Sequence, residues 1–112
     1  MAYRSRTKMG VDILQFDGDL SAFEMVKMKY RLKRLLKKNH KKLLLDLSRT
    51  RHVELVGVGI LVDRLRTVRA EKGDIKLCNM HPQVEKELKL IGIRDLMESF
   101  SSEDEAIRSF AA

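Results

Sequence analysis

The fold is decided by residues 43–59, which read Leu-Leu-Leu-Asp-Leu-Ser-Arg-Thr-Arg-His-Val-Glu-Leu-Val-Gly-Val-Gly. Residues 43–47 form a short apolar run that one aspartate interrupts, and such a run is typical of a strand buried on both faces of a sheet. The apolar residues that follow recur at the three-and-four spacing of one helix face, at Val58, Leu61, Val62, Leu65 and Val68. This stretch therefore predicts a buried strand, an exposed polar loop and a helix.

The loop between this strand and this helix, residues 48–57, is the first place to look for function. In open α/β sheets, binding sites gather at the carboxyl ends of the strands, and this loop follows such an end. Gly57 and Gly59 stand where the loop is expected to meet the helix. Glycine at such a junction permits a sharp turn or the close approach of another segment.

Strands and helices alternate along the rest of the chain. Strands are expected at residues 3–8, 11–16, 43–47, 75–78 and 96–100, and helices at 22–38, from Val58 toward Gly73, at 82–91 and after Ser102. The order β-β-α-β-α-β-α-β-α predicts an α/β fold, with a mostly parallel mixed sheet of about five strands and about four helices. The length of 112 residues suits one domain that covers residues 1–112.

Several residues have the chemistry that begins or ends a helix. Ser21 with Glu24, and Ser102 with Glu105, match the capping box of a helix N-terminus. Gly73 is expected to adopt the left-handed conformation beyond the second helix. These residues indicate where the helices begin and end.

Composition argues for a folded, cytoplasmic protein. Apolar residues make up 44% of the chain, which suits a packed core and argues against disorder. No apolar run approaches the length of a membrane span, and the N-terminal residues lack the apolar core of a signal peptide. Cys78 is the single cysteine, so no disulfide can form within the chain. No membrane partner is therefore expected.

The charge is positive and uneven, and it offers an alternative function. The 23 lysines and arginines outnumber the 16 acidic residues, for a net charge of +7. Many of these cations fall in the helix expected at residues 22–38, and such a helix can attract nucleic acid, an anionic membrane or an acidic protein. Tyr30 is the aromatic residue among the lysines, and no helix-turn-helix or zinc-finger pattern is visible. A solvated helix face is favoured, and an electrostatic nucleic-acid or acidic-protein binder is the alternative.

The residues that commonly bind metals do not form a convincing set. Asp17, Asp19 and Asp46 stand at strand ends, as the acids of a magnesium-binding phosphoreceiver domain do. The usual lysine at a later strand end is not evident, so Asp46 is expected instead to accept backbone hydrogen bonds in the following loop. Cys78 and His81 have the spacing of a metal pair, but a closed zinc site needs four ligands. Cys78 is therefore expected to be a small buried side chain, and no metal or cofactor is expected.

A catalytic set is not evident either. Ser48, His52 and Glu54 lie close together in the sequence, but a catalytic triad is defined by three-dimensional geometry. Gly57 and Gly59 alone are too few for a phosphate-binding loop, which needs further glycines and a lysine. We therefore expect that the protein is not an enzyme.

Six segments carry a resemblance to a known family. They are Phe-Asp-Gly-Asp-Leu at 16–20, Leu-Leu-Leu-Asp-Leu-Ser at 43–48, Gly-Val-Gly-Ile-Leu at 57–61, Ile-Lys-Leu-Cys at 75–78, Leu-Ile-Gly-Ile at 90–93 and Glu-Ala-Ile at 105–107. Each segment is moderately specific, and together they span nearly the whole chain. In this order they resemble the STAS domain, the fold of the bacterial anti-sigma factor antagonists.

The chain departs from that family at one informative place. Members typically carry Asp-Ser-Ser-Gly before the second helix, and a partner kinase, which is also the anti-sigma factor, phosphorylates the second serine. The corresponding residues here are Glu54, Leu55, Val56 and Gly57. Val56 has no hydroxyl group, so the phosphate, with its charge of about −1.5 to −2, cannot be attached there. Ser21 stands where many members have a further aspartate.

The resemblance implies a non-catalytic protein-interaction module of bacterial transcription or stress regulation. Its partner would be a kinase-type anti-sigma factor or another STAS protein, and a homodimer is left open. The residues expected to bind the partner are Asp19, Ser21, His52, Glu54, Leu55, Val56, Gly57 and Val58.

Two questions about the loop stay open at the level of sequence. Val56 is expected either to form a small apolar patch with Leu55 or to pack beneath the start of the helix, whereas packing is favoured for Val58. Phosphate on Ser48 or Thr50 would show that the phosphorylation switch has moved along the chain.

Overall fold

The computed structural model describes residues 3–111. Its strands are β1 (Tyr3–Lys8), β2 (Val11–Asp17), β3 (Lys42–Arg49), β4 (Asp74–Cys78) and β5 (Ser99–Phe100), and its helices are α1 (Ala22–Lys37), α2 (Leu55–Ala70), α3 (Pro82–Ile91) and α4 (Glu103–Ala111). A short 3-10 helix, Arg94–Leu96, precedes β5. The expected order of strands and helices is confirmed. Among these helices, none is both long enough and apolar enough to span a bilayer.

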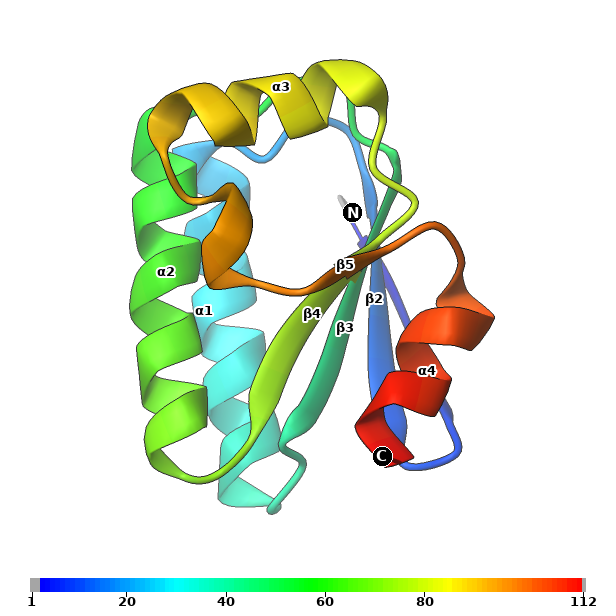
Figure 1. The fold of residues 1–112 in the computed structure, drawn as a ribbon. Helices are drawn as coiled ribbons and strands as arrows, with labels where there is room; N and C mark the ends of the chain where they lie inside the picture. The colour runs from blue at the N-terminus through cyan, green and yellow to red at the C-terminus, as the bar shows by residue number, and fades with distance from the viewer. Residues whose placement is uncertain (1–2, 112) are drawn as a thin grey trace.

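The strands form one sheet in the order β1-β2-β3-β4-β5. β1 runs antiparallel to β2, and the other neighbouring pairs are parallel. Parallel neighbours need a crossover connection, which α1, α2 and α3 provide. Figure 1 shows α1 and α2 side by side on one face of the sheet, α3 across one end of that layer, and α4 on the opposite face. The expected α/β fold with a mixed, mostly parallel sheet is confirmed.

β3 is buried on both faces, as its apolar run predicts. Leu43, Leu45 and Leu47 pack into the larger apolar cluster with α1, α2 and α3. Leu44 points to the other face and packs into a smaller cluster with α4. Full burial of one such leucine stabilises a fold by roughly 1.5–3 kcal/mol, so β3 contributes to both layers of the core.

β3 also runs further than expected. It continues through Ser48 and Arg49, although these residues are polar. The reason lies in β2, whose register shifts between Gln15 and Asp17 and so brings Asp17 opposite Arg49. The sequence pattern of β3 alone could not reveal a pairing that depends on an irregularity in its neighbour.

α2 begins at Leu55 rather than near Val58. The N–H of Val58 already donates to the carbonyl oxygen of Glu54 at 2.9 Å, which is a helical hydrogen bond. Gly57 and Gly59 therefore lie inside the first turns of the helix and not at its junction with the loop. The loop between β3 and α2 therefore comprises only residues 50–54, fewer than expected.

The last strand is shorter than expected, because only Ser99 and Phe100 pair with β4. The carbonyl oxygen of Leu96 accepts a hydrogen bond from Arg69 Nη2 at 2.8 Å, so this residue is tied to α2 rather than to the sheet. Met97, which follows, is buried in the larger cluster.

The residue in the left-handed conformation after α2 is Lys72, with φ 67°, and not Gly73. Gly73 is required for another reason, since a Cβ there would lie 2.5 Å from the carbonyl oxygen of Lys41. Gly92 adopts φ 90° and ends α3. α1 ends at Lys37, one residue before its expected bound.

Candidate functional site

Three segments meet where β2 and β3 end. Leu20, in the turn after β2, and Val53, in the loop after β3, form an isolated parallel bridge. The N–H of Leu20 donates to the carbonyl oxygen of His52 at 3.1 Å, and the N–H of Glu54 donates to that of Leu20 at 3.0 Å. Turn, loop and the first turn of α2 are therefore held as one unit. We call its outward residues the loop–helix surface: Asp19, Ser21, His52, Glu54, Leu55 and Val56.

Asp19 and His52 join the turn after β2 to the loop after β3, and the loop to α3. Asp19 Oδ1 accepts a hydrogen bond from the backbone N–H of His52 at 3.2 Å. The imidazole Nδ1 of His52 lies 3.2 Å from Glu87 Oε1 on α3. Both predicted residues thus hold the loop in place.

Ser21 and Glu54 both cap α1. Ser21 Oγ accepts from the N–H of Glu24 at 3.2 Å, which confirms Ser21 as the N-cap. Glu54 Oε1 accepts from the N–H of Ala22 at 2.9 Å, although Glu54 itself precedes α2. A carboxylate at the free N–H groups of a helix start is favourable, so Glu54 ties the loop to α1.

Gly57 is the point where α2 touches the turn most closely. A Cβ on Gly57 would lie 2.6 Å from the carbonyl oxygen of Leu20 and 3.0 Å from that of Ser21. A Cβ on Gly59 would meet nothing within 4 Å. The expected close approach is therefore confirmed at Gly57 and wrong at Gly59.

Leu55 and Val56 project from the first turn of α2 into solvent. Leu55 is 69% exposed and Val56 is 64% exposed, whereas Val58 is 1% exposed. Packing beneath the helix is therefore confirmed for Val58, and Val56 belongs to an exposed apolar pair with Leu55. Gly57 and Val58 are both buried, so these two of the predicted partner-binding residues are not presented to a partner.

The two hydroxyl groups considered as alternative phosphorylation sites, those of Ser48 and Thr50, differ in exposure. Residues 51–66 contain no serine or threonine. Thr50 is fully buried. Ser48 is half-buried, and its Oγ lies 3.3 Å from Gln15 Nε2. Thr50 is therefore not presented to another protein.

Asp46, near the end of β3, is a buried carboxylate that accepts hydrogen bonds from the residues around it. Its Oδ1 accepts from the N–H of Ser48 at 2.9 Å, which confirms the expected backbone hydrogen bond. Burial raises the pKa of Asp46, but hydrogen bonds with Glu103, Ser48 and Asn79 outweigh burial and keep its pKa below the ordinary value. Across residues 3–111, no three side chains of histidine, cysteine, aspartate or glutamate gather to hold a metal.

Cys78 is fully buried in the smaller cluster, as expected. Burial, and then the nearby carboxylates of Asp46 and Glu103, raise the pKa of its thiol to about 12. The thiolate is the reactive species, so we expect the native protein to resist a disulfide reagent at about pH 8, while the chain unfolded in guanidinium reacts fully. Absorbance of the released thiol measures this, and fast reaction of the native protein would contradict it.

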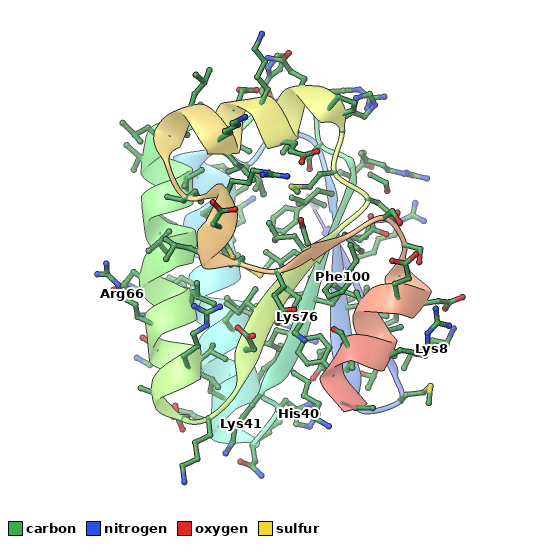
Figure 2. The ribbon with its side chains drawn as sticks, in the orientation of Figure 1. Lys8, His40, Lys41, Arg66, Lys76 and Phe100 are labelled. Atoms are coloured by element: carbon green, nitrogen blue, oxygen red, sulfur yellow. The ribbon has the colours of Figure 1, made fainter. Side chains whose placement is uncertain are left out.

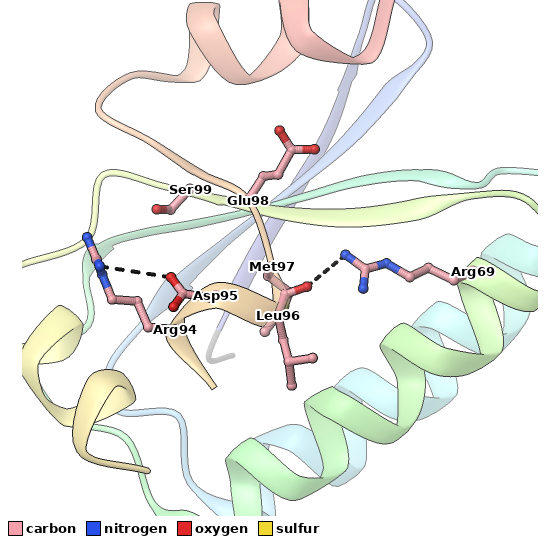
Figure 3. Close-up of a pocket in the computed structure, with 7 residues that line it drawn as sticks. All are labelled: Arg69, Arg94, Asp95, Leu96, Met97, Glu98 and Ser99. Carbon is pink, nitrogen blue, oxygen red and sulfur yellow. Dashed lines mark hydrogen bonds and ion pairs between the residues drawn. The ribbon is translucent and has the colours of Figure 1, made fainter. Parts of the chain in front are cut away.

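A surface hollow of about 480 Å³ lies beside β5, and Figure 3 shows the residues that line it. Its two arginines are already engaged. Arg69 donates to the carbonyl oxygen of Leu96 and to Asp74, and Arg94 donates to Glu85. None of the predicted site residues lines this hollow.

One set of exposed apolar side chains was not among the predicted site residues. Phe23, Val26 and Tyr30 of α1 are large, apolar and exposed. Their spacing of three and four residues, offset from the core stripe of the same helix, was the available signal.

Comparison with known proteins agrees with this fold. The family model described as STAS domain matches residues 3–106. No curated protein matches the sequence significantly.

Solved structures share the fold at low sequence identity. A protein from Thermotoga maritima has a TM-score of 0.89 at 20% identity, with 98% of this chain and 95% of that chain covered. An anti-sigma factor antagonist from Mycobacterium paratuberculosis has a TM-score of 0.84 at 14% identity, with coverage of 98% and 93%. The anti-sigma factor antagonist SpoIIAA of Bacillus, in its unphosphorylated form, has a TM-score of 0.76 at 17% identity, with coverage of 99% and 99%.

Proposed function

The chain belongs to the STAS domain family, and on that premise we propose that it is a non-catalytic protein-interaction module of the anti-sigma factor antagonist kind. Residues 1–112 act as one cytoplasmic domain in this proposal. The partner is a kinase-type anti-sigma factor or another STAS protein, and it binds the loop–helix surface.

The exposure of Leu55 and Val56 is the observation that carries this proposal. Both side chains stand on a helical turn that is pinned by the hydrogen bonds between Leu20, His52 and Glu54. A rigid apolar pair loses little conformational entropy when a partner covers it. Such anchors at the centre of an interface commonly supply most of the binding free energy.

Binding at this surface is constitutive in our proposal. SpoIIAA has been solved both with and without its phosphate. Val56 of the present chain offers no oxygen for a phosphate, and Thr50 lies in the core. A partner that covers Val56 therefore meets a methyl-bearing side chain at this position whether or not the partner is an active kinase.

Replacing Leu55 and Val56 together with aspartate should remove partner binding. Burial of two exposed apolar side chains can supply a few kcal/mol, so we expect affinity to fall roughly hundredfold or more. The wild-type chain, cross-linked in native lysate, should retain a kinase-type or STAS protein that the double variant loses. Mass spectrometry identifies the retained protein.

Leu90→Asp is the matched control, because Leu90 is 78% exposed on α3 and outside the loop–helix surface. This variant should retain the partner as the wild type does. Equal retention by the double variant would contradict the assigned surface. Phosphate on the chain after incubation with the captured partner and ATP would contradict constitutive binding.

A further inference from the structure

Within residues 3–111, α1 has a second apolar face that stays largely exposed. Its core stripe consists of Met25, Met28, Leu32 and Leu35, all buried. Phe23, Val26 and Tyr30 lie off this stripe and are 69%, 44% and 57% exposed. Residues three and four apart are neighbours on a helix surface, so these three side chains form one ridge, which we call the α1 ridge.

Cations surround the α1 ridge. The exposed basic residues of α1 are Lys27, Lys29, Lys33, Arg34 and Lys37. Lys27 Nζ lies 4.3 Å from the centroid of the Phe23 ring, so charge and apolar surface adjoin directly. Glu24, the single acidic residue of α1, is half-buried in its first turn.

The combination of an apolar ridge and a cationic border limits what can cover this face. A second copy of the same face would bring like charges together, which is unfavourable. A membrane-bound helix offers the bilayer a broad apolar face, but α1 has already buried its broad face in the core. A polynucleotide would satisfy the cations and leave Val26 without an apolar partner.

We propose that the α1 ridge and its cations bind an acidic, amphipathic segment of a partner protein. Aliphatic side chains of that segment pack on Phe23, Val26 and Tyr30, and its carboxylates form ion pairs with the surrounding lysines. The face shares no residue with the loop–helix surface, so this interaction is additional to the proposed function. Electrostatic complementarity would make the association fast and dependent on salt.

Three synthetic helical peptides test the proposal. They have equal length and one leucine stripe, and their polar faces carry glutamate, glutamine or lysine. Fluorescence anisotropy should show that the glutamate peptide binds at least roughly tenfold more tightly than the glutamine peptide, because several exposed ion pairs each add a small favourable contribution. The lysine peptide should bind most weakly.

Variants then assign the binding to this face. Phe23→Ser with Val26→Ser and Tyr30→Ser should abolish binding of the glutamate peptide, and Lys27→Gln with Lys33→Gln and Arg34→Gln should weaken it roughly tenfold. Leu90→Ser is the control and should bind normally, and thermal melting checks that every variant is folded. Equal affinity for the three peptides, or unchanged binding by the ridge variant, would overturn the proposal. So would tighter binding to single-stranded DNA or to phosphatidylglycerol vesicles than to the glutamate peptide.

Discussion

Gly57→Ala is expected to lower the free energy of unfolding by about 1–3 kcal/mol, whereas Gly59→Ala is expected to raise it by about 0.5–1 kcal/mol. Both glycines lie in the first turns of α2, two residues apart. The same substitution should therefore act in opposite directions within one helix.

The difference follows from what a methyl group meets at each position. At Gly57 a Cβ would lie 2.6 Å from the Leu20 carbonyl oxygen, which is backbone and cannot rotate away. That oxygen also accepts the hydrogen bond from Glu54, so a shift there strains or breaks the bond. At Gly59 a Cβ has open space, and alanine is the better helix former because it has less conformational entropy to lose.

Denaturant unfolding of the two variants, followed by circular dichroism, measures both changes. Partner binding should also weaken in Gly57→Ala, because Leu55 and Val56 move with the displaced turn of α2. Equal destabilisation by the two substitutions would mean that helix propensity and steric contact do not determine how alanine changes the free energy of unfolding at these positions. Little loss of stability in Gly57→Ala would mean that α2 and the turn can separate at small cost.

The sequence predicts the layers of this fold well, because each layer depends on a local pattern. The apolar run at 43–47 predicts a strand buried on both faces. The apolar stripes of α1 and α2 indicate which faces of these helices pack against that strand. Ser21 caps α1 as predicted, because a helix cap depends on a few neighbouring atoms.

The features that could not be predicted from the sequence depend on contacts between segments that are distant in the chain. Glu54 caps α1, 32 residues earlier in the chain, and no local pattern around it encodes this. From the sequence, Gly73 is expected to be a left-handed residue. In the structure, glycine is needed there because Lys41 lies too close to leave room for a Cβ. Val56 is apolar in a mostly apolar helix, and only the packing of that helix shows that it faces solvent.

α4 covers the second face of the sheet almost alone, and its attachment is concentrated in few contacts. Ala106 and Ile107 pack with Ile13, Leu44 and Cys78 in the smaller cluster. Lys76 reaches from β4 into this layer, where its Nζ lies 2.8 Å from Ser109 Oγ and 4.4 Å from the centroid of the Phe110 ring. Figure 2 shows Lys76 beside α4 with Phe100 nearby.

Ile107→Ala should therefore detach α4 before the rest of the chain unfolds. Ile107 is 4% exposed, and truncating such a side chain to alanine typically costs about 2–5 kcal/mol. Because α4 covers Cys78, this loss should appear as local opening, with labelling of the Cys78 thiol roughly thirtyfold or more faster than in the wild type. The rate of thiol labelling in native buffer is the measurement.

Leu88→Ala is the matched control for this prediction. Leu88 is 1% exposed on α3 and belongs to the larger cluster on the opposite face. Its truncation should lower the global stability by a similar amount and leave the labelling rate of Cys78 nearly unchanged, because it does not release α4. Equal acceleration by both variants would show that Cys78 becomes accessible only through global unfolding, and that the two layers of the core open together.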